Sequence, residues 1–132
     1  MIMKTIIVDD DPFSSFLTES MLRLENFSEQ VMTFSSAEET LDFLKQDINE
    51  NAPQVIFLDL NMPTMNGWQF LQALKPHESA LSNNCNVFIL SSSINSAEQN
   101  MAKDHAIVKG FISKPLTENH IDKIKHDFCH VA

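Results

Sequence analysis

The sequence has few positive charges, few cysteines and no long apolar run. Lysine and arginine together number 9 against 18 aspartates and glutamates, which gives a formal net charge of −9. Such an acidic chain repels a phosphate backbone, so direct binding to nucleic acid is not expected. The apolar runs are too short to span a bilayer, and no secretory signal is recognisable. The two cysteines, Cys85 and Cys129, decide little, and a cytoplasmic protein is the simplest interpretation.

Internal repeats, low-complexity segments and linkers are also absent, and the remaining composition is that of one globular domain. Hydrophobic residues make up 43% of the 132 residues and charged residues 20%. These proportions supply a hydrophobic core and argue against disorder. A chain of this length suits a single domain. We therefore expect one domain over residues 1–132, with no output domain attached to it.

Short apolar runs alternate with helix-forming patterns along the chain. Continuous apolar runs of this length are typical of strands that are buried on both faces of a parallel sheet. The runs lie at Thr5–Val8, Val31–Phe34, Val55–Leu58, Val87–Leu90 and Phe111–Ile112. Five repeats of a strand followed by a helix predict an α/β fold with a doubly wound sheet.

Most of the intervening helices carry a recognisable starting signal. Pro12 suits a first helical position, and Asp11 before it is the expected N-cap. Capping boxes follow at residues 36–39 and 96–99, and Thr117 can cap the last helix. Apolar residues in the first helix recur at helical spacing and are expected to belong to the core: Phe13, Phe16, Leu17, Met21 and Leu24.

Polar residues that can bind or react with a ligand follow four of the five runs. They are Asp9–Asp11, Asp59, Ser91–Ser93 and Ser113–Pro115. The carboxyl ends of parallel strands share one edge of the sheet, and ligands of open α/β sheets bind at that edge. We therefore expect acids, a hydroxyl and an ammonium group to converge there.

The expected group of side chains is suited to phosphoryl transfer. Carboxylates that lie together repel one another, so each has a raised pKa unless a cation is among them. Ligands that are all oxygen are what Mg²⁺ prefers, and a carboxylate can attack a phosphoryl group to form an aspartyl phosphate. The transfer also needs a metal, a lysine and a hydroxyl to neutralise the phosphoryl oxygens. Asp9, Asp10 and Asp59, with Ser91 and Lys114, would supply that whole set.

With these residues in view, the chain resembles the receiver domain of two-component response regulators, of the stand-alone, chemotaxis-regulator-like type. The resemblance rests on four pieces in the right order and spacing: IIVDDDP, FLDLNMPTMNG, ILSS and GFISKP. It implies a flavodoxin-like fold, with a five-stranded parallel sheet in the order 2-1-3-4-5 and helices on both faces. It also implies a phosphorelay switch that accepts its phosphoryl group from a histidine kinase or histidine phosphotransfer protein, with Mg²⁺ or Mn²⁺ as cofactor.

The resemblance assigns expected roles residue by residue. Asp59 is similar to the phosphoacceptor of the family. Asp9 and Asp10 match the acids that hold the metal together with Asp59, and the backbone carbonyl of Asn61 matches a further protein ligand. Lys114 matches the lysine that pairs with the phosphoryl group and that precedes a cis peptide bond.

Other matched positions concern switching and hydrolysis. Ser91 takes the place of the more usual threonine, and its hydroxyl is expected to move onto the phosphoryl group. Phe111 matches the aromatic switch residue but lacks the hydroxyl of tyrosine, so its two states can differ only in how the ring packs. Asn61 and Ser93 occupy positions that influence hydrolysis of the phosphoryl group. The face made by the fourth helix, fifth strand and fifth helix is expected to change shape for a downstream protein, which the sequence does not identify.

Two other functions stay open at this point. A phosphatase that forms an aspartyl phosphate resembles a pattern with a second acid two residues after the nucleophile, where this chain has Asn61. A pseudo-receiver, which never takes phosphate, usually lacks one of Asp10, Asp59 or Lys114, and this chain keeps all three. The favoured interpretation is a domain that catalyses only its own phosphorylation and dephosphorylation. Near the end of the sequence, three residues at helical spacing suit either metal binding or a solvated helix face: His126, Cys129 and His130.

Overall fold

Five parallel strands form one sheet in the computed structural model, which describes residues 2–81, 85–92 and 94–128. The strands are β1 (Ile2–Val8), β2 (Ser28–Phe34), β3 (Val55–Asp59), β4 (Asn86–Ser91) and β5 (Val108–Ser113). Their order across the sheet is β2-β1-β3-β4-β5. Both the α/β class and the strand order expected from the sequence are therefore confirmed.

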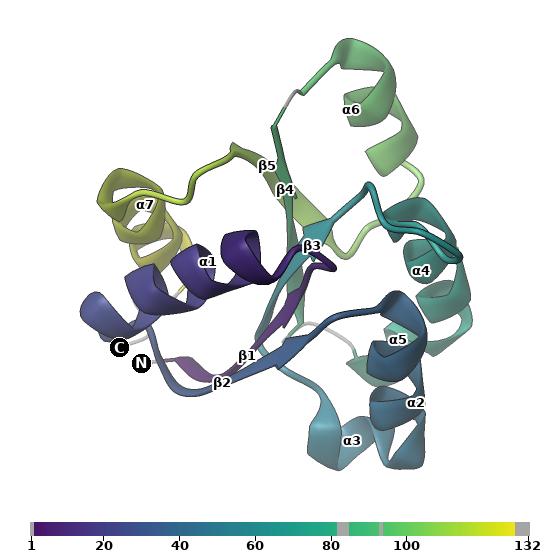
Figure 1. Cartoon of the computed structure of the whole chain (residues 1–132). Coiled ribbons are helices and arrows are strands. Elements are labelled where there is room, and N and C mark those ends of the chain that lie inside the picture. Colours follow the sequence, from purple (N-terminus) through teal and green to yellow (C-terminus); the bar gives the residue numbers. More distant parts are fainter. Residues whose placement is uncertain (1, 82–84, 93, 129–132) are drawn as a thin grey trace.

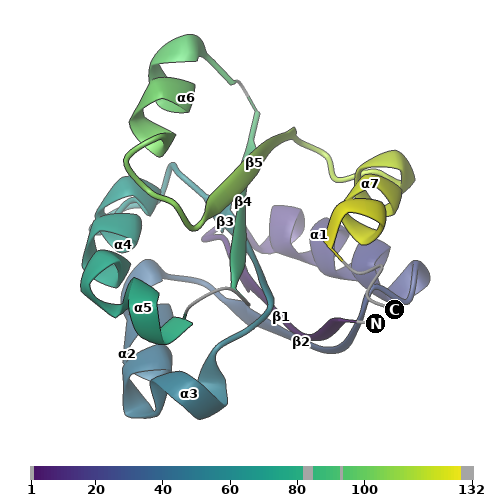
Figure 2. The same cartoon turned by 180° about the vertical axis from the view of Figure 1, so that it is seen from behind.

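Helices cover both faces of this sheet, as Figures 1 and 2 show from opposite sides. One face carries α1 and α7, and the other carries α2, α4 and α5, while α6 stands apart from both groups. The helical segments are α1 (Pro12–Leu24), α2 (Ala37–Gln46), α3 (Ile48–Asn51), α4 (Gly67–Leu74), the 3₁₀ turn η1 (Lys75–His77), α5 (Glu78–Leu81), α6 (Ser96–Ala102) and α7 (Glu118–Phe128).

Two hydrophobic cores lie on the two faces of the sheet, because neighbouring residues of a strand point to opposite sides. Ile6 of β1 packs in one core with residues of α2 and α4. Ile7 packs in the other core, where Leu22 of α1 and Ile121 of α7 meet the sheet. Burial on both faces explains why β3, β4 and the second half of β1 are continuous apolar runs in the sequence. The central strands thus form a rigid base for the loops at their carboxyl ends.

The apolar residues of α1 are mostly exposed, which corrects the expectation that they belong to the core. Phe13, Phe16 and Leu24 are 69%, 67% and 73% exposed. The buried residues of α1 are instead Ser15, Thr18 and Leu22. The Ser15 hydroxyl donates to the Asp9 carbonyl at 3.2 Å and the Thr18 hydroxyl to the Ser14 carbonyl at 3.0 Å. Because these bonds satisfy the buried hydroxyls, the small polar side of the helix can pack on the sheet.

The helix starts agree with the sequence in part. Asp11 caps α1 by accepting from the Phe13 amide at 3.0 Å, and Ser36 caps α2 by accepting from the Glu39 amide. The expected box at 96–99 is wrong by one residue, because Asn95 caps α6 and accepts from the Glu98 amide at 2.8 Å. The short segments α3, η1 and α5 were not expected either, since three or four residues are too few to show a helical period.

The edge strand β5 contains an irregularity. Val87 of β4 pairs with Val108, but the next residue, Phe88, pairs with Gly110, so Lys109 is an extra residue in β5. Lys109 is exposed, and its amine donates to the Ala106 carbonyl at 3.1 Å. None of the helices in the described ranges has the length and apolar character that crossing a membrane requires.

Candidate functional site

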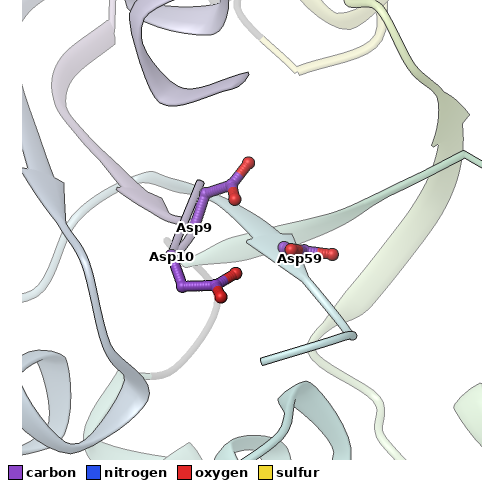
Figure 3. A group of neighbouring side chains, drawn as sticks. All are labelled: Asp9, Asp10 and Asp59. Atoms are coloured by element: carbon purple, nitrogen blue, oxygen red, sulfur yellow. The ribbon is translucent and has the colours of Figure 1, made fainter. Parts of the chain in front are cut away.

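Three carboxylates gather at the carboxyl edge of the sheet. Asp9 and Asp10 follow β1 directly, and Asp59 is the last residue of β3. Because β1 pairs with β3 and Val8 lies opposite Leu58, the next residues of both strands meet at this edge. Figure 3 shows the three side chains together, and a carboxylate oxygen from each lies within 4.8 Å of the others. The convergence expected from the strand ends is thus present.

The acids differ in their surroundings. Asp9 is buried, and its carboxylate accepts from the Asp11 amide at 3.0 Å. The Asp9 amide donates to the carbonyl of Phe34, so the backbone is held to the end of β2. Asp10 is exposed and reaches the same site from the solvent side. The pair therefore combines one fixed carboxylate with one that faces water.

Lys114 places a positive charge between these carboxylates. Its amine lies 3.1 Å from an oxygen of Asp9 and 3.8 Å from an oxygen of Asp59. The Lys114 amide donates to the Ser91 carbonyl at 2.9 Å, which ties the end of β5 to the end of β4. The peptide bond from Lys114 to Pro115 is cis, as the resemblance implied.

Burial raises the pKa of the Asp59 carboxyl to about 6. The amide of Asn61, which donates to Asp59 at 3.2 Å, and the charge of Lys114 both oppose this rise. The charges of Asp9 and Asp10 raise the pKa of Asp59 further, but they contribute less than burial does. Mutual repulsion of the acids is the cause expected from the sequence, whereas removal from water is the larger cause of the raised pKa of Asp59 in the structure.

The first turn of α4 supports the backbone of Asp59, which was not expected from the sequence. The Gly67 amide donates to the Leu60 carbonyl at 3.0 Å. A Cβ at Gly67 would lie 2.9 Å from the Asp59 carbonyl oxygen and 2.8 Å from the Leu60 Cα, which only glycine avoids. Asn66 starts α4 through a capping box with Gln69. The Asn-Gly pair in the sequence was the available signal.

The other expected site residues differ in their burial and in their place in the fold. Ser91 is buried and directly follows Leu90, the partner of Asp59 in the sheet. Phe111 is partly buried and packs against the core that contains α2 and α4. Asn61 is exposed in the loop after β3. Ser93, Cys129 and His130 lie outside the described residues, and His126 is exposed on α7, so the alternative of metal binding there stays an interpretation of the sequence.

Comparisons with known proteins agree with this arrangement. The sequence model of the response regulator receiver domain matches residues 5–125. A search among curated proteins finds no match. Among solved structures, a two-component response regulator from Cytophaga hutchinsonii is 27% identical, with a TM-score of 0.89 and 98% of both chains covered. A response regulator receiver protein from Dyadobacter fermentans is 28% identical, with a TM-score of 0.81, covering 94% of this chain and 96% of its own.

The likeness of this chain to a more distant structure supports the fold but no further property. The chemotaxis protein CheY4 of Vibrio cholerae is 21% identical, with a TM-score of 0.75, covering 97% of this chain and 99% of its own. The family match spans nearly all of the strands and helices described above, including the three clustered acids and Lys114. This chain therefore belongs to the receiver domain family of response regulators.

Proposed function

We propose that this chain is a phosphorelay switch that takes a phosphoryl group onto Asp59 from a phosphohistidine of a histidine kinase or phosphotransfer protein. The observation that carries the proposal is the position of the Asp59 carboxylate at a strand end, beside two other acids and within 3.8 Å of the Lys114 amine. With a pKa of about 6, the carboxylate is mostly ionised at pH 7 and is then a competent nucleophile.

The chemistry divides among the side chains of the site. An oxygen of Asp59 attacks the phosphorus while the bond from phosphorus to the donor imidazole nitrogen breaks, and the electron pair stays on that nitrogen. Lys114 and the Ser91 hydroxyl stabilise the negative charge on the phosphoryl oxygens. In the later hydrolysis, water attacks the phosphorus, inorganic phosphate leaves and the Asp59 carboxylate is restored. Asn61 and Ser93 are the residues proposed to set the rate of that step.

The acid cluster fits Mg²⁺ or Mn²⁺, because its donors are all oxygen and one of them, Asp10, faces solvent. Asp9, Asp10 and Asp59, with the backbone carbonyl of Asn61, would hold the metal. When bound, such an ion supplies positive charge that neutralises the phosphoryl oxygens during transfer. The protein residues position the acceptor oxygen and limit the access of water to it.

Ser91 and Phe111 are the proposed switch residues. The Ser91 hydroxyl moves toward the phosphoryl group, and Phe111 turns into the space that it leaves. Phe111 is partly buried against the core that includes Ile89, its partner in the sheet. A change in its packing alters the surface made by α6, β5 and α7, which is where we place the unknown downstream protein.

The exposed residues of α1 suit the docking of the phosphodonor protein. We name Phe13, Phe16, Leu17 and Leu24 the α1 apolar face; they are four of the six large hydrophobic residues exposed in the described chain. Phe16 lines a hollow of about 340 Å³ that Asp9 and Asp10 also line. A protein that delivers phosphoryl to Asp59 must cover the rim of the site, and the α1 apolar face is continuous with that rim.

Phosphoryl uptake tests the proposal directly. The purified protein, given Mg²⁺ and acetyl phosphate, should gain one phosphoryl group that both acid and base hydrolyse. Asp59→Asn should abolish the gain, which intact-mass spectrometry measures. As a matched control, Asp42→Asn removes an exposed aspartate of α2 and should take up phosphoryl like the parent. Undiminished uptake by Asp59→Asn, or by the parent without a divalent metal, would overturn the assignment.

The same experiment separates the two alternative functions. A phosphatase would release inorganic phosphate from added phosphate esters with many turnovers, whereas the proposed switch holds at most one phosphoryl group per chain and does not act on phosphate esters. The exposed amide side chain of Asn61, in place of an acid, does not favour the phosphatase. A pseudo-receiver would take no phosphoryl group at all, and the retained contact of Lys114 with two acids does not favour it.

A further inference from the structure

Two aromatic rings connect α4 to the segment between α6 and β5. Trp68 is the second residue of α4, and His105 lies between α6 and β5. Their ring centroids are 6.2 Å apart with an interplanar angle of 30°, which is a stacked arrangement. Trp68 is partly buried, and it packs against the core formed with α2 and α4. The stack therefore joins the core to a segment near the sheet edge.

His105 is held by this packing rather than by side-chain hydrogen bonds. Its side chain is buried, at 7% exposed, and its Nδ1 has no hydrogen-bond partner. A buried polar atom without a partner is unfavourable, so the position needs a compensating contact. The backbone of His105 is fixed at both ends: its amide donates to the Ala102 carbonyl, and its carbonyl accepts from the Val108 amide. Any shift of the imidazole is thus shared with the end of α6 and the start of β5.

On the other side, Trp68 is one residue from the support of the phosphoacceptor. The preceding Gly67 packs against the Asp59 carbonyl and the Leu60 Cα so closely that no Cβ fits. A displacement of the Asp59 backbone therefore acts on the first turn of α4, which carries the indole ring. The path from Asp59 to His105 runs through directly packed groups.

The element at the end of this path is held by few contacts. Ala102 is the only buried residue that α6 contributes, and Met101 is 48% exposed. Figures 1 and 2 both show α6 standing away from the other helices. An element with so little buried surface shifts at low cost, and its anchored end decides its position. That anchored end lies three residues before His105.

We propose that the stack of Trp68 on His105 is a mechanical link through which phosphorylation of Asp59 changes the position of α6. The two residues are positioning residues, and they act separately from Ser91 and Phe111. The inference rests on the proposed phosphoryl transfer. Because coupling between two sites is reciprocal, a partner that binds α6 would in turn shift the loop around Asp59 through the same pair.

Amide hydrogen exchange of Ser96–Ala102, with and without acetyl phosphate and Mg²⁺, tests the link. The parent should show a change of exchange in α6 on phosphorylation. His105→Ala and Trp68→Leu should keep full phosphoryl uptake but lose most of the α6 change. His105→Phe keeps an aromatic ring against Trp68 and should restore the change of exchange in α6. Lys103→Gln, an exposed change between α6 and His105, is the matched control and should respond like the parent.

The outcomes separate the link from the proposed function. Absence of phosphoryl uptake in the parent overturns both. Uptake without an α6 change in the parent, or an undiminished α6 change in Trp68→Leu, overturns the link alone. Trp68→Leu leaves the sequence of α6 and His105 unchanged. It therefore still tests the link if His105→Ala loosens α6 by itself. Trp68 is the single tryptophan of the chain, and its fluorescence should report the same change in the parent.

Discussion

Asp59 is a buried carboxyl group whose neighbours shift its pKa in opposite directions. Loss of contact with water and the two nearby acids favour its protonated form, while Lys114 and the Asn61 amide favour the charged form. The balance leaves the pKa at about 6, so ionisation at neutral pH has an energetic cost that the unfolded chain does not bear. A phosphoryl group or a bound cation at this position changes that balance, which makes Asp59 a sensitive point of the molecule.

The raised pKa of Asp59 predicts a specific pH dependence of stability in the metal-free protein. An unfolded aspartate titrates near pH 4, so the folded state holds its proton more tightly. This contribution to stability is complete below about pH 4 and is lost as the pH rises through about 6. The loss should be on the order of 1–2 kcal/mol, since water still reaches one side of the site. Denaturant unfolding in EDTA should show the parent losing this much stability relative to Asp59→Asn between pH 4 and pH 7; a stability difference that does not change with pH would contradict the prediction.

The orientation of α1 about its own axis gives the helix two different sides, one packed on the sheet and one exposed to solvent. The Asp11 cap and the bond from Ser15 to the Asp9 carbonyl turn the small residues toward the sheet. The large residues then face solvent beside the phosphoacceptor site. Exposing several large apolar side chains on one helix is unfavourable unless a partner covers them, at least transiently.

Substitutions on the α1 apolar face should slow phosphotransfer from a protein without affecting the chemistry. In Phe13→Gln/Leu17→Gln, uptake from acetyl phosphate and the free energy of unfolding should stay near the parent values, because both side chains are exposed. Transfer from a phosphorylated histidine phosphotransfer protein should slow by about tenfold or more, as expected for the loss of interface anchors. Rapid-quench measurement of the transfer rate checks this. Met101→Gln, an exposed apolar change on α6, is the control, and equal slowing in it would argue against docking on α1.

The central strands β1, β3 and β4 were predictable because short apolar runs that end in polar residues are typical of strands buried on both faces of a parallel sheet. Once their order was implied, the convergence of Asp9, Asp10, Asp59 and Lys114 followed from the shared edge of a parallel sheet. These inferences need only local composition and a strand order, and the structure confirms the strand order and the convergence of the acids.

The features that were missed depend on hydrogen bonds between particular atoms. Counting apolar residues placed Phe13 and Phe16 inside, because the pattern does not reveal that the hydroxyls of Ser15 and Thr18 are satisfied by nearby carbonyls. The start of α6 was displaced by one residue, since both Asn95 and Ser96 are good caps and only the geometry chooses between them. The contact of Gly67 with Asp59 is a matter of tenths of an ångström, which no sequence pattern specifies.

For the whole molecule, binding of a divalent cation should be visible as increased stability. The acid cluster exists only in the folded state, so a cation that binds there stabilises folding by an amount that grows with the logarithm of its concentration above the dissociation constant. At one hundred times the dissociation constant, the gain should be about 2.7 kcal/mol. Melting temperatures across a Mg²⁺ titration measure it, and an unchanged midpoint up to tens of millimolar would contradict the site.

A charge-removing variant of the cluster sharpens this prediction. Asp10→Asn should weaken the response to Mg²⁺ while stabilising the metal-free protein slightly, because Asp10 opposes the ionisation of Asp59 only weakly. Asp11→Asn is the matched control: it removes a neighbouring charge, asparagine can still cap α1, and Asp11 lies outside the acid cluster. A metal-free Asp10→Asn protein that is less stable than the parent, or a normal Mg²⁺ response in it, would speak against the assigned ligands.

The extra residue in β5 has a consequence for how this protein behaves in a crowded solution. β5 ends one side of the sheet, and an outer strand with free backbone groups can pair with strands of other molecules and start aggregation. At Lys109 the regular spacing of those groups is interrupted, and the extra residue is an exposed, charged lysine, a type that disfavours pairing on an edge strand. On the opposite side, Glu29 and Gln30 are exposed polar residues in the first half of β2. Both borders of the sheet thus discourage intermolecular strand pairing.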